Sequence, residues 1–438
     1  MFFAVLIIVL IVCFIFFTRK RNKSTDILKE KIDKIDFGNN NGELKIVQVS
    51  DIHYIDSSIT DFGNSFINKV EKADGRSIRY IDQILDSFIL EMIKESPDVI
   101  VVSGDLTYNG EKISHQVLSR KLQILRKKGI EVLVIPGNHD IENENAKKFE
   151  GDKTFEVESV SPEEFKNIYK DFGYSDENPR VVGRDKNSLS YMYMVAPDKC
   201  VLMVESSYGK NNLEISNQTF TWIERMLNIA NKNNISVISV THENILAHNK
   251  MFISGYKIDN SAKLVDLYSK YNVRLNLSGH MHLQHISENE GVIDAAIGCI
   301  ALYPNLYALV YIDKDNTLDY HTEALEVSEW ALKYGWKDDN LINFKSYSRK
   351  KFDSIGISQA SPILEKIDIT LEEKRRMMKF MLDTCAAYFS GTLSEYPNLN
   401  ADSEEYGMWK KYCENTFLMS FLNSIYIDKT QCHNKFKI

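Results

Sequence analysis

The chain has 438 residues, of which 44% are hydrophobic, so it can bury a sizeable core and form a large α/β domain with an appended region. Its net charge of -8 is mild, and no basic surplus indicates binding to a nucleic-acid polymer. The six cysteines are scattered without a Cys-x-x-Cys pair, which argues against a zinc ribbon and indicates no disulfide framework.

Residues 1–17 are uninterruptedly apolar and predict a single transmembrane anchor. At 1.5 Å per residue, a helix of this length reaches about 25 Å, the short end of a bilayer span. Basic residues follow the segment rather than precede it, and no small-residue cleavage site follows, so we expect an uncleaved anchor. The positive-inside rule then places the following domain in the cytoplasm. Basic residues upstream of Met1 would reverse that orientation and make the domain extracytoplasmic.

A polar, lysine-rich linker is expected over residues 18–43, ending in a turn rich in glycine and asparagine. Strands and helices alternate after it. The predicted strands are 44–50, 99–103, 132–135, 200–205, 235–240 and 273–277, and the predicted helices between them are 78–94, 114–128, 218–231 and 262–271. This alternation is typical of a largely parallel sheet covered by helices.

Three further strands, over 292–297, 306–312 and 318–322, complete a catalytic domain that we assign to residues 44–328. The remaining residues, 329–438, are rich in aromatic and helix-forming residues and predict a small helical domain. Within it, Thr370 and Glu373 have the spacing of a capping box and mark the start of a helix through Phe389.

Five short polar clusters follow the apolar strands. They are Asp51-Ile52-His53, Gly104-Asp105, Gly137-Asn138-His139-Asp140, His242 and Gly279-His280-Met281-His282. Each alone is common, but the carboxyl ends of parallel strands meet at one edge of a sheet, where ligands bind. The set therefore predicts one site with the groups that a two-metal phosphoester hydrolase needs.

The chemistry of such a site explains these residue types. Two divalent ions about 3.5–4 Å apart need an anionic bridge, and the carboxylate of Asp105 is the candidate. Mixed imidazole, carboxylate and amide ligands favour Mn, Fe or Zn over Ca. A hydroxide shared by the two ions would attack phosphorus, and a nearby imidazole would protonate the leaving alkoxide.

Over roughly residues 43–325, with all five clusters, the sequence resembles the calcineurin-like metallophosphoesterase family. Within it, residues 104–111 and 278–285 are most similar to bacterial class III cyclic-nucleotide phosphodiesterases with a helical C-terminal extension. The resemblance implies a sandwich of two packed sheets flanked by helices. It also implies two metal ions and a small phosphoester substrate.

The resemblance further implies a role for each polar residue. Asp105 would bridge the ions, while the terminal ligands would be Asp51, His53 and His282 for the first ion and Asn138, His242 and His280 for the second. His139 would contact the phosphoryl group and assist the leaving group, with Asp140 orienting it. The sequence departs from the family at Glu243-Asn244, where relatives often have histidine or proline after the middle histidine.

Other polar residues are weaker candidates. Tyr108, Asn109 and Asn244 stand just past presumed ligands and are candidates for binding substrate. Arg76 has the chemistry to bind phosphate, but Asp74-Gly75-Arg76 has the composition of a solvated turn. Three other histidines are expected to have structural roles: His248 and His285 in loops, and His115 on a helix surface.

We therefore expect a membrane-anchored phosphodiesterase, with cyclic nucleotides as the first substrate class to test. A phosphomonoesterase, including a protein phosphatase, is the alternative among enzymes, because a metal pair alone does not select between monoesters and diesters. The alternative of another class is an inactive metal-binding scaffold that recruits partners at the membrane. Sequence patterns give no oligomeric state.

Overall fold

The structure, a computed structural model, describes residues 32, 34–37, 42–207, 213–428 and 432–438. The predicted anchor at residues 1–17 and most of the predicted linker at 18–43 lie outside these ranges. Within them, no helix has the length and apolar character needed to cross a bilayer.

The first of two large sheets has six strands in the order β15-β14-β13-β1-β2-β3. Its strands are β1 (Leu44–Val49), β2 (Val99–Ser103), β3 (Glu131–Ile135), β13 (Leu306–Ile312), β14 (Leu318–Ala324) and β15 (Lys435–Lys437). The pairs β1–β2 and β2–β3 are parallel, whereas β13, β14 and β15 add to the other edge as antiparallel neighbours. Three of the predicted polar clusters therefore follow adjacent parallel strands.

The second sheet has seven strands in the order β11-β12-β10-β9-β8-β7-β6. They are β6 (Val181–Arg184), β7 (Tyr191–Ala196), β8 (Lys199–Met203), β9 (Ser236–Val240), β10 (Leu275–Ser278), β11 (His285–Asn289) and β12 (Val292–Ala296). Strands β8, β9, β10 and β12 are parallel, and β6, β7 and β11 are antiparallel. The alternation of strands and helices alone predicted a largely parallel sheet; the structure instead has two mixed sheets, as the family resemblance implied.

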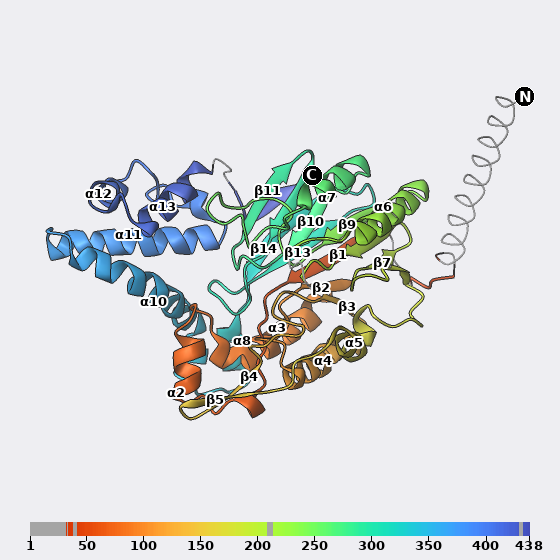
Figure 1. Cartoon of the computed structure of the whole chain (residues 1–438), viewed down its shortest axis with the longest axis horizontal. Helices are drawn as coiled ribbons and strands as arrows, with labels where there is room; N and C mark the ends of the chain where they lie inside the picture. The colour runs from red at the N-terminus through yellow and green to blue at the C-terminus, as the bar shows by residue number, and fades with distance from the viewer. Residues whose placement is uncertain (1–31, 33, 38–41, 208–212, 429–431) are drawn as a thin grey trace, which may run out of the picture.

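Residues from both sheets share one apolar core, which includes Val47, Val101, Val240 and Leu277. The central strands are buried on both faces, as expected for continuous β-branched runs. Helices α3 (Ile81–Glu95) and α4 (Lys112–Arg126) cover the first sheet, while α6 (Asn217–Lys232) and α7 (Ser261–Lys270) cover the second (Figure 1). Shorter elements are α2 (Asn64–Phe66), α5 (Pro162–Ile168), β4 (Lys147–Glu150) and β5 (Lys153–Glu156).

A helical region follows β14, as predicted. Its helices are α8 (Val327–Lys333), α9 (Asp339–Ile342), α10 (Phe344–Glu365), α11 (Leu371–Phe389), α12 (Glu404–Cys413) and α13 (Phe417–Ile427). The predicted capping box is present: Glu373 N donates to Thr370 Oγ1, and Thr370 N donates to the Glu373 carboxylate. Helices α10 to α13 enclose an apolar core of their own around Trp409 and Met419.

The chain does not end in this helical region. Strand β15 returns to the first sheet and pairs with β14, so that Tyr320 lies opposite Phe436 and their rings stack with centroids 5.0 Å apart. The helical domain predicted for residues 329–438 is therefore followed, at its C-terminal end, by a strand that belongs to the first sheet. The three residues of β15, Lys435-Phe436-Lys437, are too few to show the alternation that predicts a strand.

Candidate metal centre

Each predicted ligand lies in a loop that follows the carboxyl end of a strand. The loops after β1 and β2 are tied together by backbone hydrogen bonds from Asp51 N to Gly104 O (3.1 Å) and from His53 N to Asp105 O (3.0 Å). Five presumed ligands have positive φ: Asp51 (54°), His53 (49°), Asp105 (49°), His280 (66°) and His282 (54°). Such backbone is costly for residues with a side chain and concentrates at functional sites.

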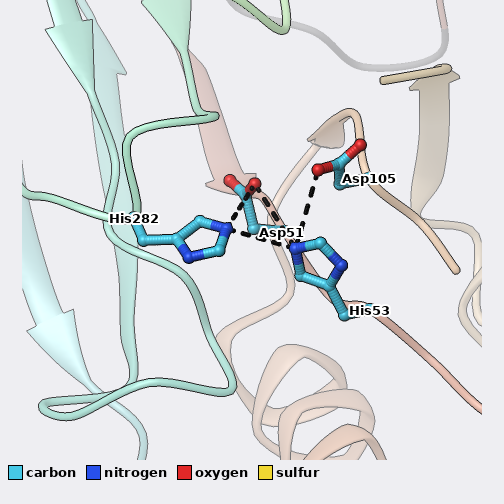
Figure 2. A group of neighbouring side chains, drawn as sticks. All are labelled: Asp51, His53, Asp105 and His282. Carbon is cyan, nitrogen blue, oxygen red and sulfur yellow. Dashed lines mark hydrogen bonds and ion pairs between the residues drawn. The ribbon is translucent and has the colours of Figure 1, made fainter. Parts of the chain in front are cut away.

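The first group of side chains comprises Asp51, His53, Asp105 and His282, whose ligand atoms all lie within 4.8 Å of one another (Figure 2). The Nε2 atoms of His53 and His282 face each other at 3.1 Å, and His282 Nε2 lies 3.2 Å from Asp51 Oδ1. Asp51 Oδ1 is buried without a hydrogen-bond partner among the described residues. A cation placed among these atoms would satisfy both nitrogen lone pairs and the carboxylate oxygen.

The second group comprises Asp105, His242 and His280, again within 4.8 Å. Nε2 of His242 lies 3.3 Å from Asp105 Oδ1 and 3.2 Å from Oδ1 of Asn138. Nε2 of His280 lies 2.8 Å from the Gly255 carbonyl oxygen, to which it can only donate, so its Nδ1 is the nitrogen left for an ion.

Asp105 belongs to both groups through different oxygens. Oδ2 lies 3.6 Å from Nε2 of His53, whereas Oδ1 lies 3.3 Å from Nε2 of His242. A carboxylate with one oxygen toward each group is the anionic bridge that two neighbouring cations require. The structure thus places all seven predicted ligands at one edge of the sandwich.

The electrostatics favour the metal-binding forms of Asp105 and His53, but not that of His242. Burial alone would raise the pKa of Asp105, but the charges of His242, His139 and His53 outweigh it and hold that pKa well below its usual range. Burial and the guanidinium of Arg76 lower the pKa of His53 well below its ordinary value. Asp105 is therefore anionic and His53 neutral. Burial lowers the pKa of His242, but the Asp105 carboxylate outweighs burial and raises it overall.

Two glycines allow the loops to approach this closely. A Cβ atom on Gly137 would lie 2.3 Å from Asp105 Oδ1, and one on Gly104 would lie 2.3 Å from Nδ1 of His242. Real Cβ atoms do not come so near to other heavy atoms. The glycines of the Gly-Asp and Gly-Asn-His-Asp clusters are therefore required by packing against ligand side chains.

His139 lies at the rim of the two groups. Its backbone N–H donates to Asp105 Oδ1 (2.9 Å), and Nε2 lies 4.0 Å from Asp105 Oδ2. Its Nδ1 atom contacts the carbonyl oxygen of Tyr108 (2.8 Å) and Oδ1 of Asn109 (2.9 Å). The imidazole is thereby held with Nε2 toward the metal groups.

Asp140 does not contact that imidazole, contrary to the expected orienting role. Its buried carboxylate accepts hydrogen bonds from the backbone N–H groups of Leu106 (3.0 Å), Thr107 (2.9 Å) and Gly137 (2.8 Å). Burial, with the charge of Asp105, raises the pKa of Asp140 to about 7. Asp140 therefore joins the loop after β2 to the loop after β3, and His139 is positioned by Tyr108 and Asn109.

The three candidate substrate residues have structural partners. Tyr108 and Asn109 hold His139, as described above. Asn244 is buried, and its Nδ2 donates to Ser278 Oγ (2.8 Å). Glu243, where the sequence departs from the family pattern, is also buried and accepts hydrogen bonds from Ser206 and Ser207.

Two predictions of exposure are wrong. Arg76 is only 5% exposed, forms a 2.5 Å ion pair with Asp74, and lies over the ring of Tyr108 at 5.3 Å. His115 is fully buried on α4, where Nδ1 contacts the Tyr169 hydroxyl and Nε2 contacts the Asp140 carbonyl. A signal for His115 was present, because it stands three residues before Leu118 on the apolar face of the helix. No comparable signal marks the position of Arg76.

A sandwich of two mixed sheets, with two histidine–carboxylate groups joined by one aspartate, is the arrangement of a dinuclear metallohydrolase. The chain belongs to the calcineurin-like phosphoesterase family, whose model matches residues 44–284. A second model, the C-terminal domain of cyclic nucleotide phosphodiesterase, matches residues 326–431. The protein is therefore a hydrolase that acts on phosphoester bonds, and the recognition made from the motifs is confirmed.

Relatives carry related names. The chain is 25% identical over 309 residues, 70% of its length and 93% of the relative's, to "Probable glycerophosphodiester phosphodiesterase GpdQ" of Arcobacter nitrofigilis. It is 37% identical over 97 residues, 22% of its length and 33% of the relative's, to "Probable cyclic nucleotide phosphodiesterase" of Ruthia magnifica subsp. Calyptogena magnifica. A solved dimetal phosphatase from Danio rerio aligns with 64% of this chain and 96% of its own at 13% identity and a TM-score of 0.46.

Proposed function

We propose that the protein is a dinuclear-metal phosphodiesterase, with cyclic nucleotides as the first substrate class to test. The observation that carries the proposal is Asp105, whose two oxygens face two separate ligand groups. The C-terminal match to a cyclic nucleotide phosphodiesterase domain and the phosphodiesterase names of the relatives support a diester rather than a monoester.

The chain's own residues suggest how the two ions would be held. Asp51, His53 and His282 would bind one ion and Asn138, His242 and His280 the other, with Asp105 between them. Mn, Fe and Zn suit this mixture of ligands. Bound ions supply an activated water at neutral pH and neutralise charge on the phosphoryl oxygens.

His139 would act at the leaving group. Its Nδ1 hydrogen is held by the Tyr108 carbonyl, so Nε2 is the atom that exchanges a proton with the substrate. Buried Asp51 and Asp105 keep the ligand groups anionic, and Asp140 fixes the loops that carry Asp105 and Asn138.

The direct test uses protein that lacks residues 1–23, supplied with Mn. We expect it to hydrolyse bis(p-nitrophenyl) phosphate faster than p-nitrophenyl phosphate. Preference for the monoester would instead favour a phosphatase, and metal binding without turnover of either ester would favour a scaffold. A screen of cyclic nucleotides, linear diesters and phosphopeptides then identifies the substrate class.

We also propose that the apolar segment at residues 1–17 anchors the enzyme in the membrane with the catalytic domain in the cytoplasm. The apolar run and the basic residues that follow it support this orientation. A reporter fused after residue 30 tests it, because an extracytoplasmic signal would contradict the proposal.

A further inference from the structure

An apolar cavity of about 310 Å³ lies between the metal centre and the helical region. One wall comes from the catalytic domain, including Met281 and Leu302, and the other from helices α10, α11 and α13. Seven of the lining residues are phenylalanine or tyrosine, among them Phe252, Tyr256, Phe352, Tyr388 and Phe389. The helical region therefore completes a hollow that the catalytic domain alone would leave open.

The cavity adjoins the metal centre. Met281 stands between the presumed ligands His280 and His282, and it lines the cavity. The ring of Tyr256, another lining residue, has its centroid 5.7 Å from that of His280. Asp74 also lines the cavity and forms an ion pair with Arg76, whose guanidinium lies 5.3 Å from the ring centroid of Tyr108, the residue whose carbonyl holds His139. A group attached to a phosphate at the metal centre would therefore reach this cavity.

The residues that line the cavity favour an apolar, planar group over a polar one. Phe252 and Phe421 lie 5.8 Å apart, and Phe352 and Phe389 lie 5.1 Å apart, each pair in an edge-on arrangement. Aromatic rings favour a further ring at such distances. A hydroxyl-rich group such as glycerol would lose hydrogen bonds to water and find few partners, because Asp74, Gln359 and the two tyrosine hydroxyls are the main polar groups of the lining.

Size gives a second constraint. Ligand pockets in proteins span about 300–1,000 Å³, so this cavity is at the small end of the range. It has room for one ring system and not for a pair of long acyl chains. The shape, polarity and size of the cavity thus all favour a compact aromatic group.

We propose that this cavity binds an aromatic ring of the substrate's organic group, and that the helical region thereby sets substrate specificity. The proposal rests on the proposed phosphoesterase function, since the ring is placed by a phosphate held at the metal centre. It predicts a preference for esters of ring-bearing alcohols over glycerophosphodiesters.

Phosphonates test the proposal, because they keep the charged head and vary only the organic group. Calorimetry on the Mn-loaded full chain should show phenylphosphonate binding about tenfold or more tightly than methylphosphonate. Ile355→Trp, which fills the cavity from α10, should bring the two affinities within about twofold and leave methylphosphonate binding unchanged. The matched control is Leu332→Trp on α8, where the side chain is 60% exposed, and this variant should keep the wild-type ratio.

A second variant, Phe352→Leu, removes one lining ring without adding bulk and should also lower the ratio of phenylphosphonate to methylphosphonate affinity. The test therefore does not depend on a single variant folding correctly. Equal binding of the two phosphonates by the wild-type protein would overturn the proposal, as would an unchanged ratio in both cavity variants. Tighter binding of octylphosphonate than of phenylphosphonate would overturn the choice of a ring. Hydrolysis of bis(p-nitrophenyl) phosphate is measured in parallel, so a missing ring preference in an active enzyme is distinguishable from a protein that is no phosphoesterase.

Discussion

The Nδ1 atom of His139 lies 2.8 Å from the carbonyl oxygen of Tyr108. A carbonyl oxygen only accepts hydrogen bonds, so Nδ1 carries a hydrogen and Nε2 is the atom that can take up or release a proton. That atom lies 4.0 Å from Asp105 Oδ2, at the rim of the two ligand groups. The side chain is thus oriented for proton exchange through Nε2 and is not one of the seven candidate metal ligands.

Replacing His139 with alanine should lower turnover by about 10²–10⁴-fold, the range for loss of a general acid. The metal content, measured by mass spectrometry, should stay near that of the wild type, because the seven ligands remain. His321→Ala, at a partly exposed histidine on β14, is the control and should leave both quantities unchanged. Loss of both metals from the His139 variant would show that His139 is itself a ligand.

Gly137→Ala should reduce metal occupancy, because its Cβ would lie 2.3 Å from Asp105 Oδ1 and 2.7 Å from Nε2 of His242. Displacing the bridging carboxylate affects both ions, so titration with Mn should show weaker binding at both sites. Gly407→Ala on α12 is the matched control, since a Cβ there meets no atom within 4 Å. Wild-type metal affinity in the Gly137 variant would contradict the shared-carboxylate arrangement.

Glu111 should make the protein less stable as the pH rises. Burial raises its pKa to about 7 from 4.5, and its Oε1 atom has no hydrogen-bond partner among the described residues. Between these two values the folded state holds a proton that the unfolded state has released, so the free energy of unfolding falls across this window. The full effect is on the order of 3 kcal/mol.

Glu111→Gln removes that titration while keeping an acceptor for Asn109 N. Urea unfolding at pH 5 and pH 8 should therefore show the variant gaining stability relative to the wild type at the higher pH. A difference between the two proteins that does not change with pH would rule out the raised pKa.

His433 should stabilise the attachment of the chain's last residues. Its Nδ1 lies 3.2 Å from Ile286 N, its Nε2 lies 3.4 Å from Asp428 Oδ2, and its ring stacks on His285 at 3.7 Å. His433→Ala should cost about 1–3 kcal/mol, because it leaves buried polar groups without partners. Thermal unfolding checks this, with His321→Ala again as the control; equal melting temperatures would contradict it.

The sequence predicted the ligand set because strand ends carry strong local signals. The β-branched run Val99–Ser103 stops at Gly104-Asp105, and the structure has β2 over the same residues. Orientation and burial far from such signals were not predictable. Arg76 is buried by contacts with Tyr108 and Asp74 that only the tertiary structure supplies. The carboxylate of Asp140 accepts hydrogen bonds from backbone N–H groups of a neighbouring loop and does not contact the adjacent His139. This orientation depends on how the two loops are placed in the folded protein.

Strand β15 has a consequence for how this architecture can vary. The chain leaves the first sheet at Ala324 and re-enters it at Lys435, beside β14, with Lys435 opposite His321. The helical region is therefore an insert between β14 and β15, two neighbouring strands of the first sheet. Such an insert can be lengthened, shortened or exchanged without changing strand order in the sheet. One wall of the cavity beside the candidate metal centre can thus be remodelled while the candidate metal ligands stay in place.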